Sequence, residues 1–292
     1  MMMAAAGCIF IAGCAAAGSN PGTAEQTIVV NGEVRHYSLH LPKSYRYRHG
    51  AMPLVILLHG HGSSGVKIER STGMSDKADK ETFIAAFPDG RGDPRGWQVF
   101  DDAAGNNSDV AFIGQLIDTL KKLYAVAPNR IYVVGHSNGG MMAYHLGVAM
   151  PEKLAGIGVS AALLGKNFAG GNRPTPVTLV AIHGKADNIV PYDGSDGDIP
   201  YHEGFLSAPA SVEEFARRNG CDGALEKSRA NGNVVEKIYS GCDNSSAVVF
   251  VTVNNLTHKW SGDRHGFGKV IDHGDLIATN EMWSVFKDHP KQ

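Results

Sequence analysis

One segment constrains the fold of this chain more than any other. The apolar run Ile131–Val134 leads directly into Gly135-His136-Ser137-Asn138-Gly139. A helical pattern continues from there until Pro151 ends it. A strand, a sharp turn and a helix around a central serine make the arrangement of a nucleophile elbow, in which the serine hydroxyl points outward.

The pentapeptide alone would be weak evidence. The chain has 36 glycines, so a match to Gly-x-Ser-x-Gly is expected about 0.3 times by chance. The flanking pattern carries the weight, because Gly135 and Gly139 lack the Cβ atoms that would clash where strand and helix approach. Ser137 is therefore the predicted nucleophile.

Further apolar runs alternate with helical patterns along the chain. Strands are predicted at 53–58, 83–87, 154–160, 177–183 and 248–253, and helices at 108–124 and 276–287. Asn31-Gly32 predicts a two-residue hairpin turn between 27–30 and 33–41. Ser211-Val212-Glu213-Glu214 is typical of a capping box that opens a helix. We therefore expect an α/β protein with a mainly parallel sheet and helices on both faces, as one domain over 27–292.

A serine hydroxyl needs a histidine to take its proton and a carboxylate to orient that histidine. In α/β hydrolases the acid and then the histidine follow the serine, each on a loop after a strand. Asp187 follows the strand at 177–183, and His258 follows the strand at 248–253. Neighbouring residues leave alternatives open for both roles: Asp193, Asp196 and Asp198 for the acid, His265 and His273 for the base.

The tetrahedral oxyanion of acyl transfer needs two amide donors. The backbone N–H groups of Asn138, directly after the nucleophile, and of His61, in the glycine-rich loop after 53–58, are the candidates. Both would act through the backbone, so their side chains could vary without abolishing the oxyanion hole. The pair His59-x-His61 lacks a third ligand at suitable spacing, so neither a metal nor a cofactor is predicted.

The first nineteen residues differ from the rest of the chain. Residues 1–19 carry no charged side chain and have an apolar centre, which is typical of an export signal, and a polar linker is expected at 20–26. Ile11-Ala12-Gly13-Cys14 is similar to a bacterial lipobox, so Cys14 is a candidate for lipidation. Ordinary cleavage within Ala15–Ala17 is the alternative.

Two further properties bear on partners and location. The net charge is -2 and the 27 basic residues are scattered, which does not favour a nucleic-acid partner. Cys221 and Cys242 remain for the mature chain, and two cysteines in an exported protein suggest a disulfide, with unpaired thiols as the alternative. The stretch 192–210 is rich in Gly, Asp, Ser and Pro and is expected to be a lid or a surface loop.

Taken together, the motifs resemble the poly(3-hydroxybutyrate) depolymerase and feruloyl or acetyl xylan esterase family of α/β hydrolases. The matching segments span nearly the whole mature chain: residues 35–42, Leu58-His59-Gly60, Phe87-Pro88-Asp89-Gly90, Trp97, residues 108–112 and 135–142, His183-Gly184, Asp187, Val190-Pro191, Asn219-Gly220-Cys221, Gly241-Cys242, His258 and Trp260. The resemblance implies Ser137, Asp187 and His258 as a catalytic triad and Cys221 with Cys242 as a disulfide.

These features together predict an extracellular or periplasmic serine ester hydrolase. Trp97 and Trp260 are candidates to line the acyl or sugar site, with core packing as the alternative. Depolymerases of solid polyester commonly carry an added binding domain, for which 292 residues leave no room. Acyl esters of plant polysaccharides or hydroxyalkanoate oligomers are therefore the expected substrates. A serine peptidase on the same scaffold, or a polymer-binding surface lipoprotein without activity, are the alternatives.

Overall fold

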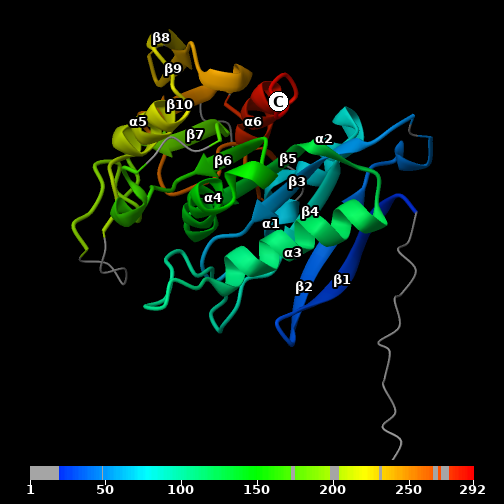
Figure 1. Cartoon of the computed structure of the whole chain (residues 1–292). Coiled ribbons are helices and arrows are strands. Elements are labelled where there is room, and N and C mark those ends of the chain that lie inside the picture. Colours follow the sequence, from blue (N-terminus) through cyan, green and yellow to red (C-terminus); the bar gives the residue numbers. More distant parts are fainter. Residues whose placement is uncertain are drawn as a thin grey trace, which may run out of the picture.

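The computed structural model describes residues 20–47, 49–171, 175–197, 204–229, 232–265, 269–270 and 276–292. The expected export signal and Cys14 lie outside these residues. Within them, ten strands form one sheet in the order β1-β2-β4-β3-β5-β6-β7-β10-β9-β8. Two short strands, β11 (Arg264–His265) and β12 (Lys269–Val270), form a separate pair. Figure 1 shows the β1–β2 hairpin at one end of the large sheet and the β8–β9 hairpin at the other.

The parallel strands make up the middle of the sheet. They are β4 (Ile84–Pro88), β3 (Met52–Leu58), β5 (Val126–His136), β6 (Gly156–Ser160), β7 (Thr178–Gly184) and β10 (Val248–Val253). Nearly all of their side chains are buried, as expected for strands that are covered on both faces. The predicted apolar runs therefore correspond to these strands, with ends that differ by a few residues.

Antiparallel strands extend the sheet at both edges. β1 (Gly22–Val30) pairs with β2 (Glu33–Leu41), and β8 (Gly223–Arg229) pairs with β9 (Val234–Ser240). The turn at Asn31-Gly32 has φ of 52° and 83° at its two residues, which confirms the predicted hairpin. The expected linker at 20–26 is wrong over most of its length, because β1 begins at Gly22 and pairs with the far end of β2.

Helices cover both faces of the sheet. One face carries α3 (Ser108–Leu123), α4 (Asn138–Ala149) and α5 (Ala208–Arg218), and the other carries α1 (Gly65–Thr72), α2 (Met74–Glu81) and α6 (Ala278–Phe286). Each group buries its apolar stripe in a separate core cluster on its own side of the sheet. The predicted α/β class, with a mainly parallel sheet between two helical layers, is confirmed.

The helix α5 begins earlier than the capping-box pattern indicates. Ser207 caps it by accepting a hydrogen bond from the Ala210 amide, and Pro209 lies in its first turn. Ser211 is instead buried inside the helix, where its Oγ accepts a hydrogen bond from the Leu164 amide at 3.0 Å. The serine expected at the helix start therefore joins α5 to the loop after β6.

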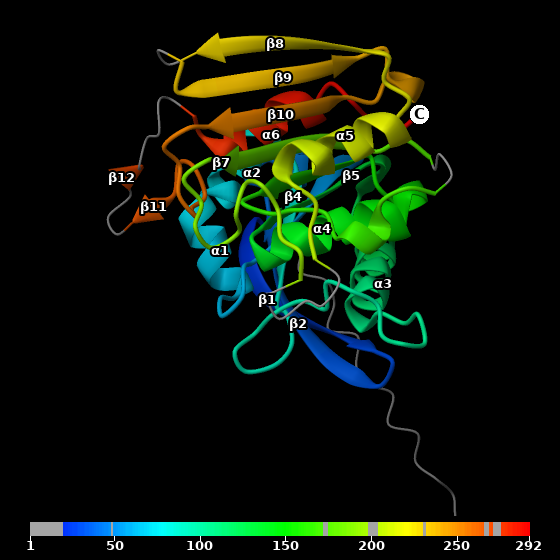
Figure 2. The same ribbon diagram turned by 90° about the vertical axis from the view of Figure 1, so that its left-hand side faces the viewer.

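Cys221 and Cys242 form a disulfide. Cys221 follows α5, and Cys242 follows β9 just before β10 re-enters the sheet. Figure 2 shows β8, β9 and β10 side by side, with α5 lying next to them. The disulfide therefore fastens the end of α5 to the edge hairpin.

Candidate active site

Ser137, His258 and Asp187 come from three strand ends and meet at the carboxyl edge of the sheet. The Ser137 Oγ lies 2.8 Å from His258 Nε2, and His258 Nδ1 lies 2.9 Å from Asp187 Oδ2. Asp187 is ionised at neutral pH and can only accept, so the Nδ1 proton points to Asp187 and Nε2 is left to accept the serine proton. The three residues are hydrogen-bonded in the order that a serine hydrolase requires.

The backbone at Ser137 is strained in the way that an elbow demands. Its φ of 55° lies in the region that L-residues rarely adopt. A Cβ on Gly135 would lie 2.1 Å from the carbonyl oxygen of Gly139, and one on Gly139 would lie 2.4 Å from the carbonyl oxygen of His59. The two glycines therefore permit the close approach of β5, α4 and the β3 loop that holds Ser137 in this conformation.

Asp187 is buried, and both of its carboxylate oxygens accept hydrogen bonds. Its Oδ1 accepts hydrogen bonds from the amides of Ile189 and Val190, each at 2.9 Å, while its Oδ2 faces His258. Burial by itself would raise the pKa of Asp187, but the bond from His258 and those from the two amides outweigh it and lower the pKa below its usual range. The carboxylate is thus kept charged and fixed in direction.

The alternative acids do not share this environment. Asp193 and Asp196 are exposed, and Asp196 pairs with Lys166. Asp198 and His273 lie outside the described residues, as does the side chain of His265.

Three histidines beside the triad have local roles. His59 is fully buried, and its Nε2 accepts a hydrogen bond from the Gly90 amide at 2.9 Å. His183 Nε2 donates to the Val190 carbonyl at 2.9 Å, which braces the loop that carries Asp187. His136 packs against the His258 ring with centroids 5.2 Å apart. Burial, followed by the nearby His258, lowers the pKa of His136 to about 3, so it stays neutral beside His258.

The two predicted oxyanion donors belong to residues that line the same cavity as Ser137. Asn138 is the first residue of α4, and His61 follows β3; both line the cavity that contains Ser137. The β3 loop comes close to the serine, since a Cβ on Gly60 would lie 3.4 Å from the Ser137 Cβ. Both N–H groups therefore belong to backbone segments next to Ser137.

The Asn138 side chain has a structural task that the sequence did not indicate. Its Oδ1 accepts from the Trp97 amide at 2.7 Å, and its Nδ2 donates to the Trp97 carbonyl at 3.2 Å. Trp97 Nε1 in turn donates to the His59 carbonyl at 2.8 Å. These bonds connect the start of α4 with the loop after β3, a role that the sequence did not indicate for the Asn138 side chain.

A buried ion pair stabilises the segment around Trp97 to which Asn138 is hydrogen-bonded. Arg35 on β2 contacts Asp109 in the first turn of α3 at 2.7 Å, with both side chains almost fully buried. The second Asp109 oxygen accepts from the Gln98 amide at 2.8 Å, next to Trp97. The pair therefore fixes the loop that binds Asn138.

The two tryptophans expected at the substrate site lie in the interior instead. Trp97 and Trp260 are each only 4% exposed, and neither lines the cavity that contains Ser137. Trp97 does line a neighbouring hollow together with His61 and Asn138. Trp97 packs against His59, and Trp260 packs against His136 within the core on the other face of the sheet. Core packing, the alternative, describes both.

The cavity beside Ser137 has a volume of about 210 Å³. Its walls come from the loops after β3, β6 and β7, from the start of α4 and from the stretch 192–210 expected as a lid or loop. They consist of His61, Ser137, Asn138, Met141, Leu163, Ile189, Val190, Pro191, Ser195 and Phe205. These lining residues include no Asp, Glu, Lys or Arg, and such a wall suits an apolar acyl group. Sequence patterns did not point to Leu163, Ser195 or Phe205, because they meet only in the folded chain.

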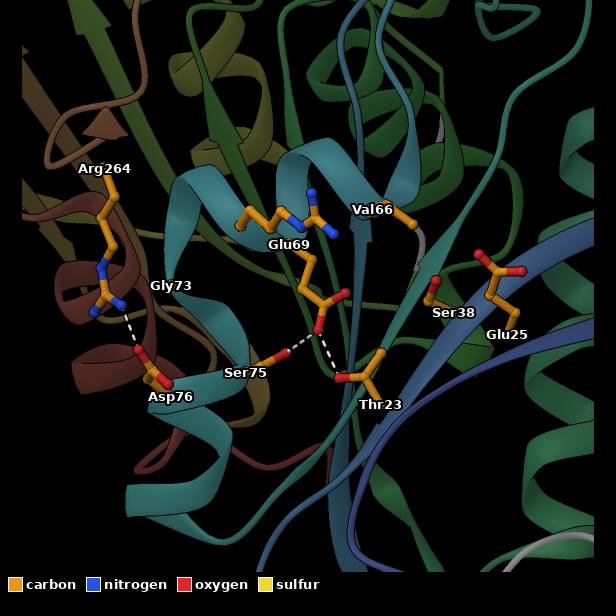
Figure 3. A pocket seen from close by; sticks show the side chains of 10 residues that line it. Thr23, Glu25, Ser38, Val66, Glu69, Gly73, Ser75, Asp76 and Arg264 are labelled. Atoms are coloured by element: carbon orange, nitrogen blue, oxygen red, sulfur yellow. Dashed lines mark hydrogen bonds and ion pairs between the residues drawn. The ribbon is translucent and has the colours of Figure 1, made fainter. Parts of the chain in front are cut away.

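A larger hollow of about 430 Å³ lies between α1, the α1–α2 turn and the β1–β2 hairpin. Figure 3 shows that several of its polar groups bind one another: Glu69 accepts from Thr23 and Ser75, and Arg264 contacts Asp76. It contains no member of the triad. Within the described residues, no group of three or more histidine, cysteine or acidic side chains is placed to bind a metal, and no helix is long and apolar enough to cross a bilayer.

The comparisons with known proteins agree with this geometry. Residues 46–208, more than half of the chain, match the family model described as phospholipase/carboxylesterase. The chain belongs to this family. It is an esterase with the α/β-hydrolase fold, similar to feruloyl and acetyl xylan esterases.

The relatives differ in length. Feruloyl esterase D of Neurospora crassa is 24% identical over 273 residues, covering 89% of this chain and 84% of the relative. Feruloyl esterase B of Piromyces equi is 29% identical over 224 residues, covering 74% of this chain but 41% of that longer protein. Among solved structures, the acetyl xylan esterase from Aspergillus awamori superposes with a TM-score of 0.64 at 13% identity, covering 90% of this chain and 99% of that one. At this identity the likeness concerns the fold alone.

Proposed function

We propose that this esterase cleaves carboxylic esters through a covalent acyl-enzyme, with Ser137 as nucleophile, His258 as general base and acid, and Asp187 as the group that orients His258. One observation carries the proposal, the continuous hydrogen-bonded path from Ser137 Oγ through the His258 ring to Asp187. Membership in the carboxylesterase family supports ester rather than peptide substrates.

In the acylation step, His258 Nε2 takes the hydroxyl proton while Ser137 Oγ bonds to the ester carbonyl carbon. The carbonyl electron pair moves to oxygen, where the N–H groups of His61 and Asn138 stabilise the negative charge. When the tetrahedral intermediate collapses, the C–O bond to the alcohol breaks and His258 donates its proton to the leaving oxygen. Asp187 stabilises the imidazolium in between and fixes its tautomer.

In the deacylation step, water takes the place of the alcohol. His258 removes one water proton, the hydroxyl oxygen bonds to the acyl carbon, and the Ser137 oxygen leaves with the proton from His258. The carboxylic acid is released and the resting state returns. The neutral His136 beside the His258 ring adds no positive charge that would oppose imidazolium formation.

The proposed substrates are acyl esters on plant polysaccharide or short hydroxyalkanoate oligomers. The apolar walls of the cavity suit the acyl part of either, and the sequence similarity to feruloyl esterases and to a bifunctional acetylxylan esterase/xylanase supports the first. Hydrolysis rates on feruloyl, acetyl-xylan, short-acyl and hydroxybutyrate esters would rank these classes.

The nucleophile itself is tested by covalent labelling. A fluorophosphonate probe is expected to add one label per chain, and peptide mapping by mass spectrometry should locate it on Ser137. Pre-incubation with the preferred ester should slow the labelling. A label on another residue, or none on an enzyme that hydrolyses esters, would contradict the assignment.

We further propose that the protein acts outside the cytoplasm, in the extracellular space or the periplasm, with Cys14 as a lipid anchor. The uncharged apolar segment at 1–19 and the lipobox-like sequence support this. In a bacterial host, the full-length chain should fractionate with membranes and Cys14→Ser should not. Soluble mature protein that begins after Ala17 would count against the anchor while leaving export intact.

A further inference from the structure

The chain enters the fold at the edge of the sheet that lies opposite the catalytic triad. Gly22, the first residue of β1, pairs with Leu41 at the end of β2, and this end of β2 pairs with the start of β4. The parallel strands therefore begin at this edge, the amino edge. They end at the triad, whose three residues follow β5, β7 and β10. The seven residues of β3 span about 20 Å between the two edges.

A basic and partly apolar surface lies at the amino edge. Its exposed side chains come from the loop before β3 and from the last turn of α3, and we call it the basic edge surface: Arg46, Tyr47, Lys121, Lys122 and Leu123. Tyr47 is 79% exposed and Leu123 is 50% exposed. Large side chains of this kind beside basic ones are typical of segments that lie in the interface of a bilayer.

The two segments that form this surface pack against each other. The rings of Tyr45 and Tyr124, both buried, lie with centroids 6.3 Å apart. The Tyr45 hydroxyl accepts from the Ala125 amide at 3.4 Å, and the Met52 amide donates to the Ala125 carbonyl at 2.7 Å. The exposed neighbours of these residues therefore belong to one continuous surface.

The positive charges on α3 are available for a partner. The acid nearest to Lys121 and Lys122 on this helix is Asp118, which pairs with Lys153 at 2.8 Å instead. Among the described residues, neither lysine forms an ion pair. The chain as a whole has a net charge of -2, so attraction to an anionic partner has to come from a local cluster of this kind.

The proposed lipid anchor leads to the same edge. Arg46 contacts the side-chain oxygen of Asn20, so the described chain begins beside the basic edge surface. Cys14 precedes Asn20 by six residues, which span at most about 22 Å when fully extended. A lipid on Cys14 therefore keeps the bilayer within reach of the amino edge, and the triad lies about 20 Å farther away across the sheet.

We infer that the basic edge surface docks on the anionic phospholipid headgroups of the bilayer that holds the Cys14 anchor, and that this docking turns the active site away from the membrane. The inference rests on the proposed lipid anchor. Arg46 and the two lysines of α3 bind headgroup phosphates, while Tyr47 and Leu123 enter the interface between them. The cavity that contains Ser137 then faces outward, where bulky esters can reach it.

The test uses the chain that begins after Ala17, which keeps every described residue and lacks Cys14, so that binding depends on the surface alone. Sedimentation with vesicles of phosphatidylcholine and phosphatidylglycerol in equal parts should show binding that high salt reverses. Each basic residue near an anionic membrane raises the partition constant about fivefold. The triple variant Arg46→Gln, Lys121→Gln, Lys122→Gln should therefore bind about 100-fold more weakly. Vesicles of phosphatidylcholine alone should bind neither protein.

A matched variant and two fluorescent probes complete the design. Lys67→Gln, Lys185→Gln, Lys227→Gln changes the net charge equally at exposed positions on other parts of the surface and should bind within about threefold of the wild type. Tyr47→Trp places a probe on the basic edge surface. Ile189→Trp places one at the catalytic cavity, where Ile189 is 60% exposed. Anionic vesicles should shift the emission of Tyr47→Trp to shorter wavelength and leave that of Ile189→Trp unchanged.

The outcomes separate this surface from the anchor and from catalysis. No binding of the wild-type chain to anionic vesicles, or equal losses in the two triple variants, would overturn the surface and leave the anchor and the esterase mechanism standing. An emission shift for Ile189→Trp alone would overturn the orientation. A lower urea midpoint with unchanged vesicle binding would also overturn the surface, because lysines that only stabilise the end of α3 predict that result. Full-length protein that does not fractionate with membranes would overturn the anchor itself, whatever the vesicles show.

Discussion

The link between Asn138 and Trp97 makes a quantitative prediction about Asn138→Ala. The substitution removes both side-chain bonds, at 2.7 Å and 3.2 Å, and leaves the N–H and C=O of Trp97 buried without partners. Unpaired buried groups cost about 1–3 kcal/mol each. Partial relaxation of the loop should bring the combined loss of unfolding free energy to about 2–4 kcal/mol.

Urea unfolding followed by tryptophan fluorescence measures this loss, and ester hydrolysis measures its consequence. The backbone N–H of residue 138 persists in the variant, but the loops around the oxyanion site lose their connection, so kcat should fall about tenfold to hundredfold. Asn188→Ala is the control, because Asn188 is exposed and should change stability by less than about 0.5 kcal/mol. A loss below about 1 kcal/mol for Asn138→Ala would refute the argument.

Three further predictions follow from buried groups and the cross-link. The pKa of His136 is lowered to about 3, so below about pH 6.5 the unfolded chain binds a proton at this residue and the folded chain does not. From pH 7 to pH 5 the unfolding free energy of the wild type should therefore fall by about 2 kcal/mol more than that of His136→Leu. Equal losses in the two proteins would contradict this prediction. Asp109→Asn should cost about 3–5 kcal/mol in urea unfolding, because it leaves Arg35 charged and unpaired in the interior, whereas a cost below 1 kcal/mol would show that the pair is dispensable. Replacing both Cys221 and Cys242 by serine should lower stability by about 3 kcal/mol, given their separation of 21 residues, and an unchanged thermal midpoint would contradict the cross-link.

The sequence predicted the interior of the fold better than its edges. Strands such as 53–58 and 131–134 are continuous apolar runs, since the central sheet is buried on both faces. β8 and β9 form an edge hairpin whose β8 side chains are mostly exposed, so they carry no comparable pattern. The predicted start of α5 is too late because two possible capping serines, Ser207 and Ser211, lie close together in the sequence. In the structure Ser207 caps the helix and Pro209 lies in its first turn.

For the candidate site, the order of motifs along the chain predicted which residues come together, but it did not predict the shape of the cavity beside them. Ser137, Asp187 and His258 follow strand ends in a fixed order, so the pattern predicted residues that the structure brings within hydrogen-bonding distance. The walls of the cavity, such as Leu163 and Phe205, come from irregular segments that only tertiary packing brings together. The aromatic residues Trp97 and Trp260 misled for a related reason, because bulk and polarity alone do not tell a substrate wall from a core position.

The most direct test of the account is the effect of Ser137→Ala on hydrolysis of p-nitrophenyl butyrate. With the fold confirmed by circular dichroism, the account predicts that kcat/KM falls by at least about 10⁴-fold, because no acyl-enzyme can form and only the oxyanion donors and binding remain. Hydrolysis that is undiminished in Ser137→Ala would contradict it.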